Sequence, residues 1–275
     1  MNRKKQIAAV KKELAALARK ETRLCRGAEK GTSAGWKEAL EHKIPQKVYF
    51  GLESAFGKGF SLVFRKGTFI IEKGYRKENL LADHAIRDFA FGQKGKRKEL
   101  KQMGRSAKRA DRINLTLTTA EGLALGFFGI GMPDVVLFLA TVLKGVYETA
   151  LHYGFGYNTP QEQLLILKMM AASLSYGEDF RGLNREVDQM LILETPEVTP
   201  EELQQQIRKT ASVFAMDMLL LKFIQGFPIV GLLGGAANPV YYRKIMKYTQ
   251  LKYRKRYLLR KKEALEHEQL VKKAF

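Results

Sequence analysis

Three ionisable side chains follow one another at four-residue spacing in the middle of the chain: Lys144, Glu148 and His152. Residues four apart share one face of a helix, so these side chains would form a single stripe. A carboxylate beside an imidazole can act as an acid–base pair or supply two ligands to a metal ion. Asp134 lies close in the chain, and Asp134, Glu148 and His152 are the weak candidates for catalytic residues. We favour the alternative, in which these side chains form a charged, solvent-facing stripe or a Lys–Glu pair within a buried helix contact.

Other active-site patterns in the sequence lack a residue or a context that their chemistry needs. The glycines of residues 51–59 do not form a phosphate-binding loop, because Gly59 stands where the loop needs a Ser or Thr for Mg²⁺. Residues 31–35 (GTSAG) match the letters of G-x-S-x-G, but they lie in a Gly-rich stretch that reads as a linker, not in the strand–turn–helix that a serine nucleophile needs. The single cysteine, Cys25, has no histidine near it in the sequence. Two ligands on one helix are weak evidence for zinc. We therefore expect a non-catalytic protein without a metal or a cofactor.

The charge of the chain indicates an anionic partner. With 48 Lys and Arg against 28 Asp and Glu, the formal net charge is +20. The excess lies in residues 1–30, 94–112 and 243–275, which carry +7, +7 and +9, whereas residues 113–242 carry −6. Anionic membranes and nucleic acids both attract such segments. The candidate membrane- or anion-binding residues are Lys11, Lys12, Arg97, Lys98, Arg254, Lys255, Arg256 and Arg260.

The elements that carry these residues read as helices. Residues 3–26 form a basic amphipathic pattern, which either lies in the headgroup region of a bilayer or packs on the protein's own core. The basic C-terminal segment is interleaved with tyrosines that would suit phosphate contacts and base stacking. Thr159 before Pro160 and Thr199 before Pro200 are typical of helix starts.

Two apolar elements rich in Gly and Pro dominate the middle of the chain. Residues 116–153 read as two helices, the second starting at about Pro133. Residues 223–242 are uncharged over 20 positions, but their prolines and glycines favour a buried or re-entrant hairpin over a spanning helix. Small residues in such hairpins let another backbone approach closely. The structural residues of the two elements are Gly122, Gly126, Gly129, Gly131, Pro133, Pro228, Gly231, Gly234 and Gly235.

The order and spacing of these residues resemble the EcsC family of bacterial proteins. The residues that carry the resemblance are Thr119, Ala120, Glu121, Gly122, Gly126, Gly129, Gly131, Pro133, Asp134, Tyr147, Glu148, Tyr153, Gly154, Pro160, Gly226, Pro228, Gly231, Gly234, Gly235 and Asn238. The resemblance covers roughly residues 45–260 and leaves most of 1–30 outside. It implies a single helical domain in a bacterial cytoplasmic or membrane-associated protein, and it supplies no catalytic residues. Because the family takes its name from a protein encoded beside an ABC exporter, a membrane transporter is an implied partner.

We interpret the chain as an all-α protein with a basic N-terminal helix (1–30), an EcsC-like multi-helix domain (36–262) and a charged tail (263–275). Its expected function is that of a cytoplasmic interaction protein that binds an anionic membrane surface or lipid, peripheral to the inner face of the membrane. Insertion of the hairpins into the bilayer stays open. The alternatives are a nucleic-acid-binding protein and an enzyme that acts on lipid.

Overall fold

The computed structural model describes residues 3–30, 44–64, 71–72, 74–107, 132–193, 197–225 and 237–274. The regular elements in these ranges are helical, which confirms the predicted all-α fold. Residues 97–107 are helical, and the other main helices are α1 (Arg3–Lys30), α3 (Gln46–Leu62), α5 (Lys77–Lys94), α7 (Met132–His152), α8 (Pro160–Leu174), α9 (Gly177–Ile192), α10 (Pro200–Gln225) and α11 (Ala237–Ala274).

Much of the two Gly/Pro-rich elements lies outside the described residues. This applies to the structural residues Gly122, Gly126, Gly129, Gly131, Pro228, Gly231, Gly234 and Gly235. The second arm of the first element is described, and it begins at Met132, one residue before the predicted start at Pro133. The prediction of a helix from this point is confirmed.

The predicted helix starts at Thr159 and Thr199 are confirmed. The Thr159 side chain accepts a hydrogen bond of 3.3 Å from the backbone N–H of Glu162, and Pro160 occupies the first turn of α8. Thr199 accepts from the N–H of Glu202 at 3.2 Å, and the Glu202 carboxylate accepts from the N–H of Thr199 at 2.9 Å. Each bond satisfies a backbone donor that a helix N-terminus otherwise leaves unpaired.

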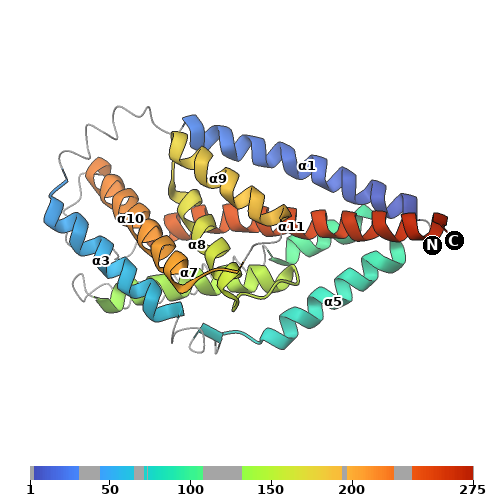
Figure 1. Ribbon diagram of the computed structural model, residues 1–275, viewed down its shortest axis with the longest axis horizontal. Helices are drawn as coiled ribbons and strands as arrows, with labels where there is room; N and C mark the ends of the chain where they lie inside the picture. Colours follow the sequence, from blue (N-terminus) through green and yellow to red (C-terminus); the bar gives the residue numbers. More distant parts are fainter. Residues whose placement is uncertain are drawn as a thin grey trace.

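Helix α11 is the axis of the molecule (Figure 1). It packs against α1, α7, α8 and α9, and α1 runs antiparallel beside it, so the two chain ends lie at the same end of the fold. The tyrosines that the sequence places among its basic residues all lie in the core: Tyr241, Tyr242, Tyr248, Tyr253 and Tyr257. The helix that reads as a basic surface helix is therefore a central core helix.

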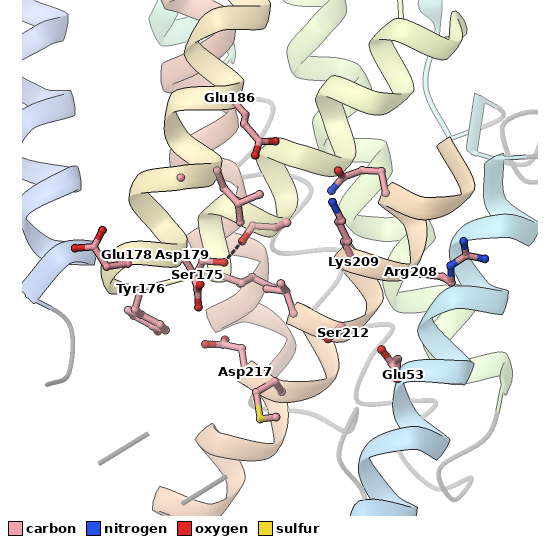
Figure 2. A pocket seen from close by; sticks show the side chains of 17 residues that line it. Glu53, Ser175, Tyr176, Glu178, Asp179, Glu186, Arg208, Lys209, Ser212 and Asp217 are labelled. Atoms are coloured by element: carbon pink, nitrogen blue, oxygen red, sulfur yellow. Dashed lines mark hydrogen bonds between the residues drawn. The ribbon is translucent and has the colours of Figure 1, made fainter. Parts of the chain in front are cut away.

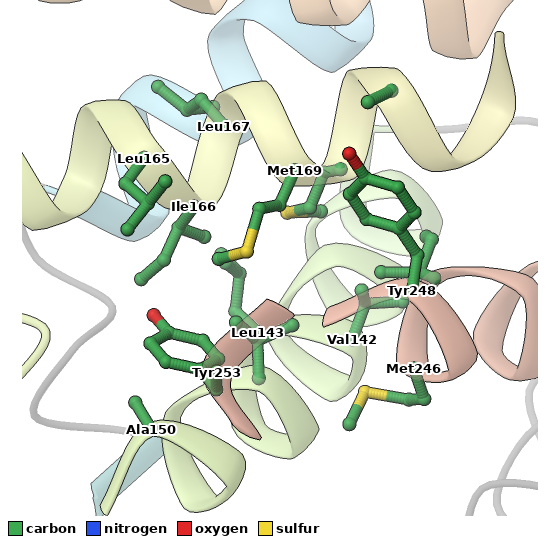
Figure 3. Close-up of a cluster of buried hydrophobic side chains, with 14 of the residues drawn as sticks. Val142, Leu143, Ala150, Leu165, Ile166, Leu167, Met169, Met246, Tyr248 and Tyr253 are labelled. Atoms are coloured by element: carbon green, nitrogen blue, oxygen red, sulfur yellow. The ribbon is translucent and has the colours of Figure 1, made fainter. Parts of the chain in front are cut away.

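Apolar side chains of α7, α8 and α11 meet in the centre of the core. Val142 and Leu143 of α7, Ile166 and Met169 of α8 and Tyr253 of α11 lie close together in Figure 3. At the other end of the fold, α3, α7 and α10 bring together an aromatic cluster. Its members are Phe56, Phe60, Phe138 and Phe214.

The apolar face of α1 packs on the protein itself. Ile7, Val10 and Leu17 are buried, and α1 contacts both α11 and α9. Of the two alternatives for this amphipathic helix, the structure shows packing on the core. In this conformation, the large apolar side chains of Ile7, Val10 and Leu17 on α1 are not available to a bilayer.

Among the described residues, one helical window is long and apolar enough to cross a membrane. It is Val135–His152 in α7, and 72% of it is buried by the rest of the protein. Core helices share this length and composition, so the window alone is weak evidence of insertion.

Candidate functional site

The two C-terminal members of the ionisable stripe on α7 lie inside the protein. Glu148 and His152 are buried, and Lys144 Nζ lies 3.9 Å from Glu148 Oε1. His152 Nδ1 lies 3.9 Å from Asp83 Oδ2, a residue of α5. The third candidate, Asp134, is in the first turn of α7, and its side chain lies outside the described residues. The stripe therefore contributes to the contact between α5 and α7.

Burial lowers the pKa of His152 more than the nearby Asp83 raises it, so the imidazole is neutral at pH 7. Within the described part of the chain its Nε2 atom is buried without a hydrogen-bond partner. Burial also raises the pKa of Cys25, which keeps this thiol protonated. The described residues contain no group of three or more His, Cys, Asp or Glu that could hold a metal ion.

A pocket of about 760 Å³ lies between α8, α9 and α10, with Glu53 of α3 at its edge (Figure 2). Its charged lining is mostly acidic: Glu53, Glu178, Asp179, Glu186 and Asp217 against Arg208 and Lys209. Ser175 Oγ in this pocket donates to the carbonyl oxygen of Ala171 at 2.9 Å. Its described lining includes no histidine to activate that hydroxyl. We assign no reaction to this pocket.

Four of the predicted anion-binding residues form ion pairs with carboxylates of the protein itself. Arg97 and Arg254 share the buried carboxylate of Glu13 on α1. Lys255 lies 2.9 Å from both Glu21 and Asp188, and Arg256 lies 2.7 Å from Glu162. An anion that bound Lys255 or Arg256 would compete with carboxylates already in place, whereas Arg254 contacts Glu13 through its Nη2 atom.

The other predicted residues are exposed. Lys12, Lys98 and Arg260 have no ion pair within the described part of the chain, and Lys11 pairs with Glu266 at 3.0 Å on the surface. These four therefore remain open to solvent anions, and the prediction that they bind a membrane stays a prediction.

A second pocket, of about 480 Å³, lies where α1 crosses α11. Five basic side chains line it: Lys20, Arg23, Arg243, Lys247 and Arg254. The remaining described lining is Leu17, Leu24, Gly104, Tyr153, Gln250 and Leu251, so none of it carries a carboxylate. Its size falls within the range of about 300–1,000 Å³ that is typical of small-molecule sites. We name it the basic pocket.

The sequence predictions included Arg254 but missed the rest of the basic pocket. A pattern that could have indicated it is the spacing of 243, 247, 250 and 254, which places four polar residues on one face of α11. The residues at 20 and 23 lie more than 200 positions away, and only the packing of α1 on α11 brings the two sets together.

The model of the EcsC protein family matches residues 8–258 of the chain. The match takes in most of α1, which the motif resemblance left outside, and it contains every described residue that lines the basic pocket. A search of curated proteins and a search of solved structures returned no significant match.

Proposed function

Because the chain belongs to the EcsC protein family, which matches it over residues 8–258, we propose that it is a non-catalytic protein that binds the anionic surface of a membrane. The observation that supports this proposal is the sorting of charge on α1. All three carboxylates of the helix pair with cations of other elements: Glu13 with Arg97 and Arg254, Glu21 with Lys252 and Lys255, and Glu29 with Arg181.

Most basic residues of α1, in contrast, are exposed to solvent. Eight of them are exposed: Lys4, Lys5, Lys11, Lys12, Arg19, Lys20, Arg23 and Arg26. The outer face of the helix therefore carries positive charge that its own carboxylates do not neutralise. We name these eight residues the α1 basic face.

A face of this kind suits an anionic bilayer. Each Lys or Arg close to such a surface contributes about 1 kcal/mol. If roughly five of the eight approach the lipid together, the attraction is about 5 kcal/mol, which corresponds to half-binding near roughly 0.2 mM accessible lipid. Salt screens the attraction between exposed basic side chains and lipid headgroups, so the binding should weaken steeply with ionic strength.

Nucleic acid is the alternative anionic partner. The case for it rested partly on tyrosines between the basic residues of α11, and all five are buried in the core, where bases cannot stack on them. This leaves phosphate contact alone to support that alternative.

Co-sedimentation of the full-length protein with neutral and anionic vesicles tests the proposal. We expect pelleting with vesicles that contain phosphatidylglycerol, release in 0.5 M salt, and little pelleting with phosphatidylcholine alone. A carbonate wash of the pelleted vesicles separates surface binding from insertion of the Gly/Pro-rich elements. Equal pelleting on both vesicle types, or preference for duplex DNA over anionic vesicles in competition, would overturn the proposal.

A further inference from the structure

The described lining of the basic pocket combines five basic side chains with apolar ones and carries no carboxylate. Four of its five basic residues, Lys20, Arg23, Arg243 and Lys247, have no carboxylate within ion-pair distance in the described part of the chain. Like charges gathered around one cavity repel one another, and an anion in the cavity would relieve that repulsion.

Gln250 provides a second, independent indication of a ligand. Its side chain is only 8% exposed, and within the described residues its Nε2 atom is buried without a hydrogen-bond partner. A buried N–H group without an acceptor is costly, and native proteins rarely leave one in that state. Gln250 lines the basic pocket, so a rotation of its side-chain amide would bring this N–H group to an acceptor atom bound there.

Arg254 is held in place beside this amide. Its guanidinium donates to Glu13, and a Cβ at Gly104 would lie 3.0 Å from Arg254 Nη1, so the missing side chain at 104 leaves room for the guanidinium. Glu13 carries one negative charge against the two guanidinium groups of Arg97 and Arg254, so this cluster keeps a net positive charge. A guanidinium fixed in this way is suited to a phosphate oxygen.

The rest of the pocket is apolar. Leu17 and Leu24 of α1 and Leu251 of α11 line it together with Tyr153. Burial raises the pKa of Tyr153 to about 12, so its hydroxyl stays protonated and adds no negative charge. The cavity, of about 480 Å³, is far larger than a phosphate ion needs. A ligand that fits both the basic side chains and the apolar side chains of the pocket carries an anionic group and a hydrocarbon portion.

We propose that the basic pocket binds the phosphate group of a phosphomonoester lipid of the phosphatidic acid type, with the Gln250 amide and Arg254 at the phosphate and the leucines along the first carbons of the lipid. A phosphomonoester carries close to two negative charges at neutral pH, which suits several basic side chains better than the single charge of a phosphodiester. This inference rests on the proposed association with a membrane, and it names the lipid that the protein would select there.

The test uses the full-length protein and short-chain lipids below their micelle concentration, so that no membrane surface is present. Calorimetric titration with dihexanoyl phosphatidic acid should show saturable binding at least ten-fold tighter than with dihexanoyl phosphatidylcholine or inorganic phosphate. If inorganic phosphate binds as tightly as the lipid, the ligand is a soluble phosphate and the lipid assignment is overturned. If neither phosphate compound binds, the site itself is overturned.

Two sets of variants locate the binding. Arg243→Ala with Lys247→Ala should weaken phosphatidic acid binding at least ten-fold, whereas Lys12→Ala with Arg19→Ala, which removes the same charge outside the pocket, should leave it within two-fold. Equal losses in the two pairs would overturn the assignment to the pocket.

Gln250→Leu separates a ligand-binding role from a structural one. It should weaken lipid binding about ten-fold and leave the melting temperature of the free protein unchanged or higher, because it removes an unsatisfied buried N–H. A lower melting temperature with unchanged affinity would overturn the role of Gln250. None of these titrations depends on the α1 basic face binding vesicles, so the pocket and the proposed membrane association can fail separately.

Discussion

The attachment of α1 to α11 depends on Glu13, and Glu13→Gln tests how much that carboxylate contributes. The Glu13 side chain is 3% exposed and pairs with Arg97 and Arg254 from two different parts of the chain. Glutamine has the same shape but no charge, so the substitution leaves the Arg254 guanidinium, 14% exposed, without its counter-charge.

The size of the effect follows from burial. Removing one partner of a buried ion pair typically costs about 3–5 kcal/mol, because the remaining charge stays desolvated. The Arg97 side chain is 39% exposed, so water can replace Glu13 there and that pair adds less than about 1 kcal/mol. We therefore expect Glu13→Gln to lower the free energy of unfolding by about 3 kcal/mol and the melting temperature by roughly 6–10 °C.

Urea unfolding followed by circular dichroism measures this difference. Glu266→Gln is the matched control, because Glu266 of α11 pairs with Lys11 of α1 at 3.0 Å, joining the same two helices at the exposed surface. It should cost less than about 1 kcal/mol. If Glu13→Gln costs no more than Glu266→Gln, the argument that buried charge pairing fixes α1 to α11 is refuted.

Three further predictions concern single positions. Burial lowers the pKa of His152, so below its ordinary pKa of 6.5 the unfolded chain binds a proton that the folded chain does not. The stability of the fold should therefore decrease as the pH drops from about 6.5. His152→Phe should flatten that part of the profile of melting temperature against pH. Gly145→Ala should destabilise the fold by about 1–2 kcal/mol in urea unfolding, because the added Cβ would lie 2.5 Å from Tyr242 Oη. Gly182→Ala should stabilise the fold by up to about 1 kcal/mol, because a Cβ added there would have no other atom within 4 Å. Thr199→Ala removes a helix cap and should cost about 1 kcal/mol in the same assay.

Each of these has an outcome that would contradict it. An unchanged pH profile in His152→Phe would show that the pKa of His152 is the same in the folded and the unfolded chain. Equal effects of Gly145→Ala and Gly182→Ala would mean that α7 and α11 are not as closely packed as described. A neutral Thr199→Ala would mean that the cap contributes no stability.

The sequence predicted what depends on local geometry. A Thr before Pro-x-Glu or Pro-Glu-Glu specifies a helix start through bonds within four residues, and both Thr159 and Thr199 form them. Apolar spacing likewise predicted a helix over residues 3–26, which lies within α1, because side chains of one helical face must be buried together.

The role of α11 could not be predicted in this way. Its basic residues lie on several faces, and periodicity gives no reason to bury Lys252, whose side chain is fully buried. The carboxylates that make this burial possible are Glu21 of α1, 2.5 Å away, and Asp188 of α9, 2.7 Å away. These partners come from helices distant in the chain, so only the tertiary structure shows that a basic, tyrosine-rich segment is a core helix.

The measurement that tests the central claim most directly is vesicle binding by a charge-reversal variant of the α1 basic face. Lys12→Glu, Arg19→Glu and Arg26→Glu together change three exposed residues that line neither described pocket. The matched control reverses three exposed basic residues on α3 and α9, Lys47→Glu, Lys58→Glu and Arg185→Glu, for the same change in net charge. We predict that pelleting with phosphatidylglycerol vesicles is lost in the first triple variant and retained in the second. Equal loss in both would show that net charge alone drives binding, and equal retention would show that α1 does not face the membrane; either result would contradict the account.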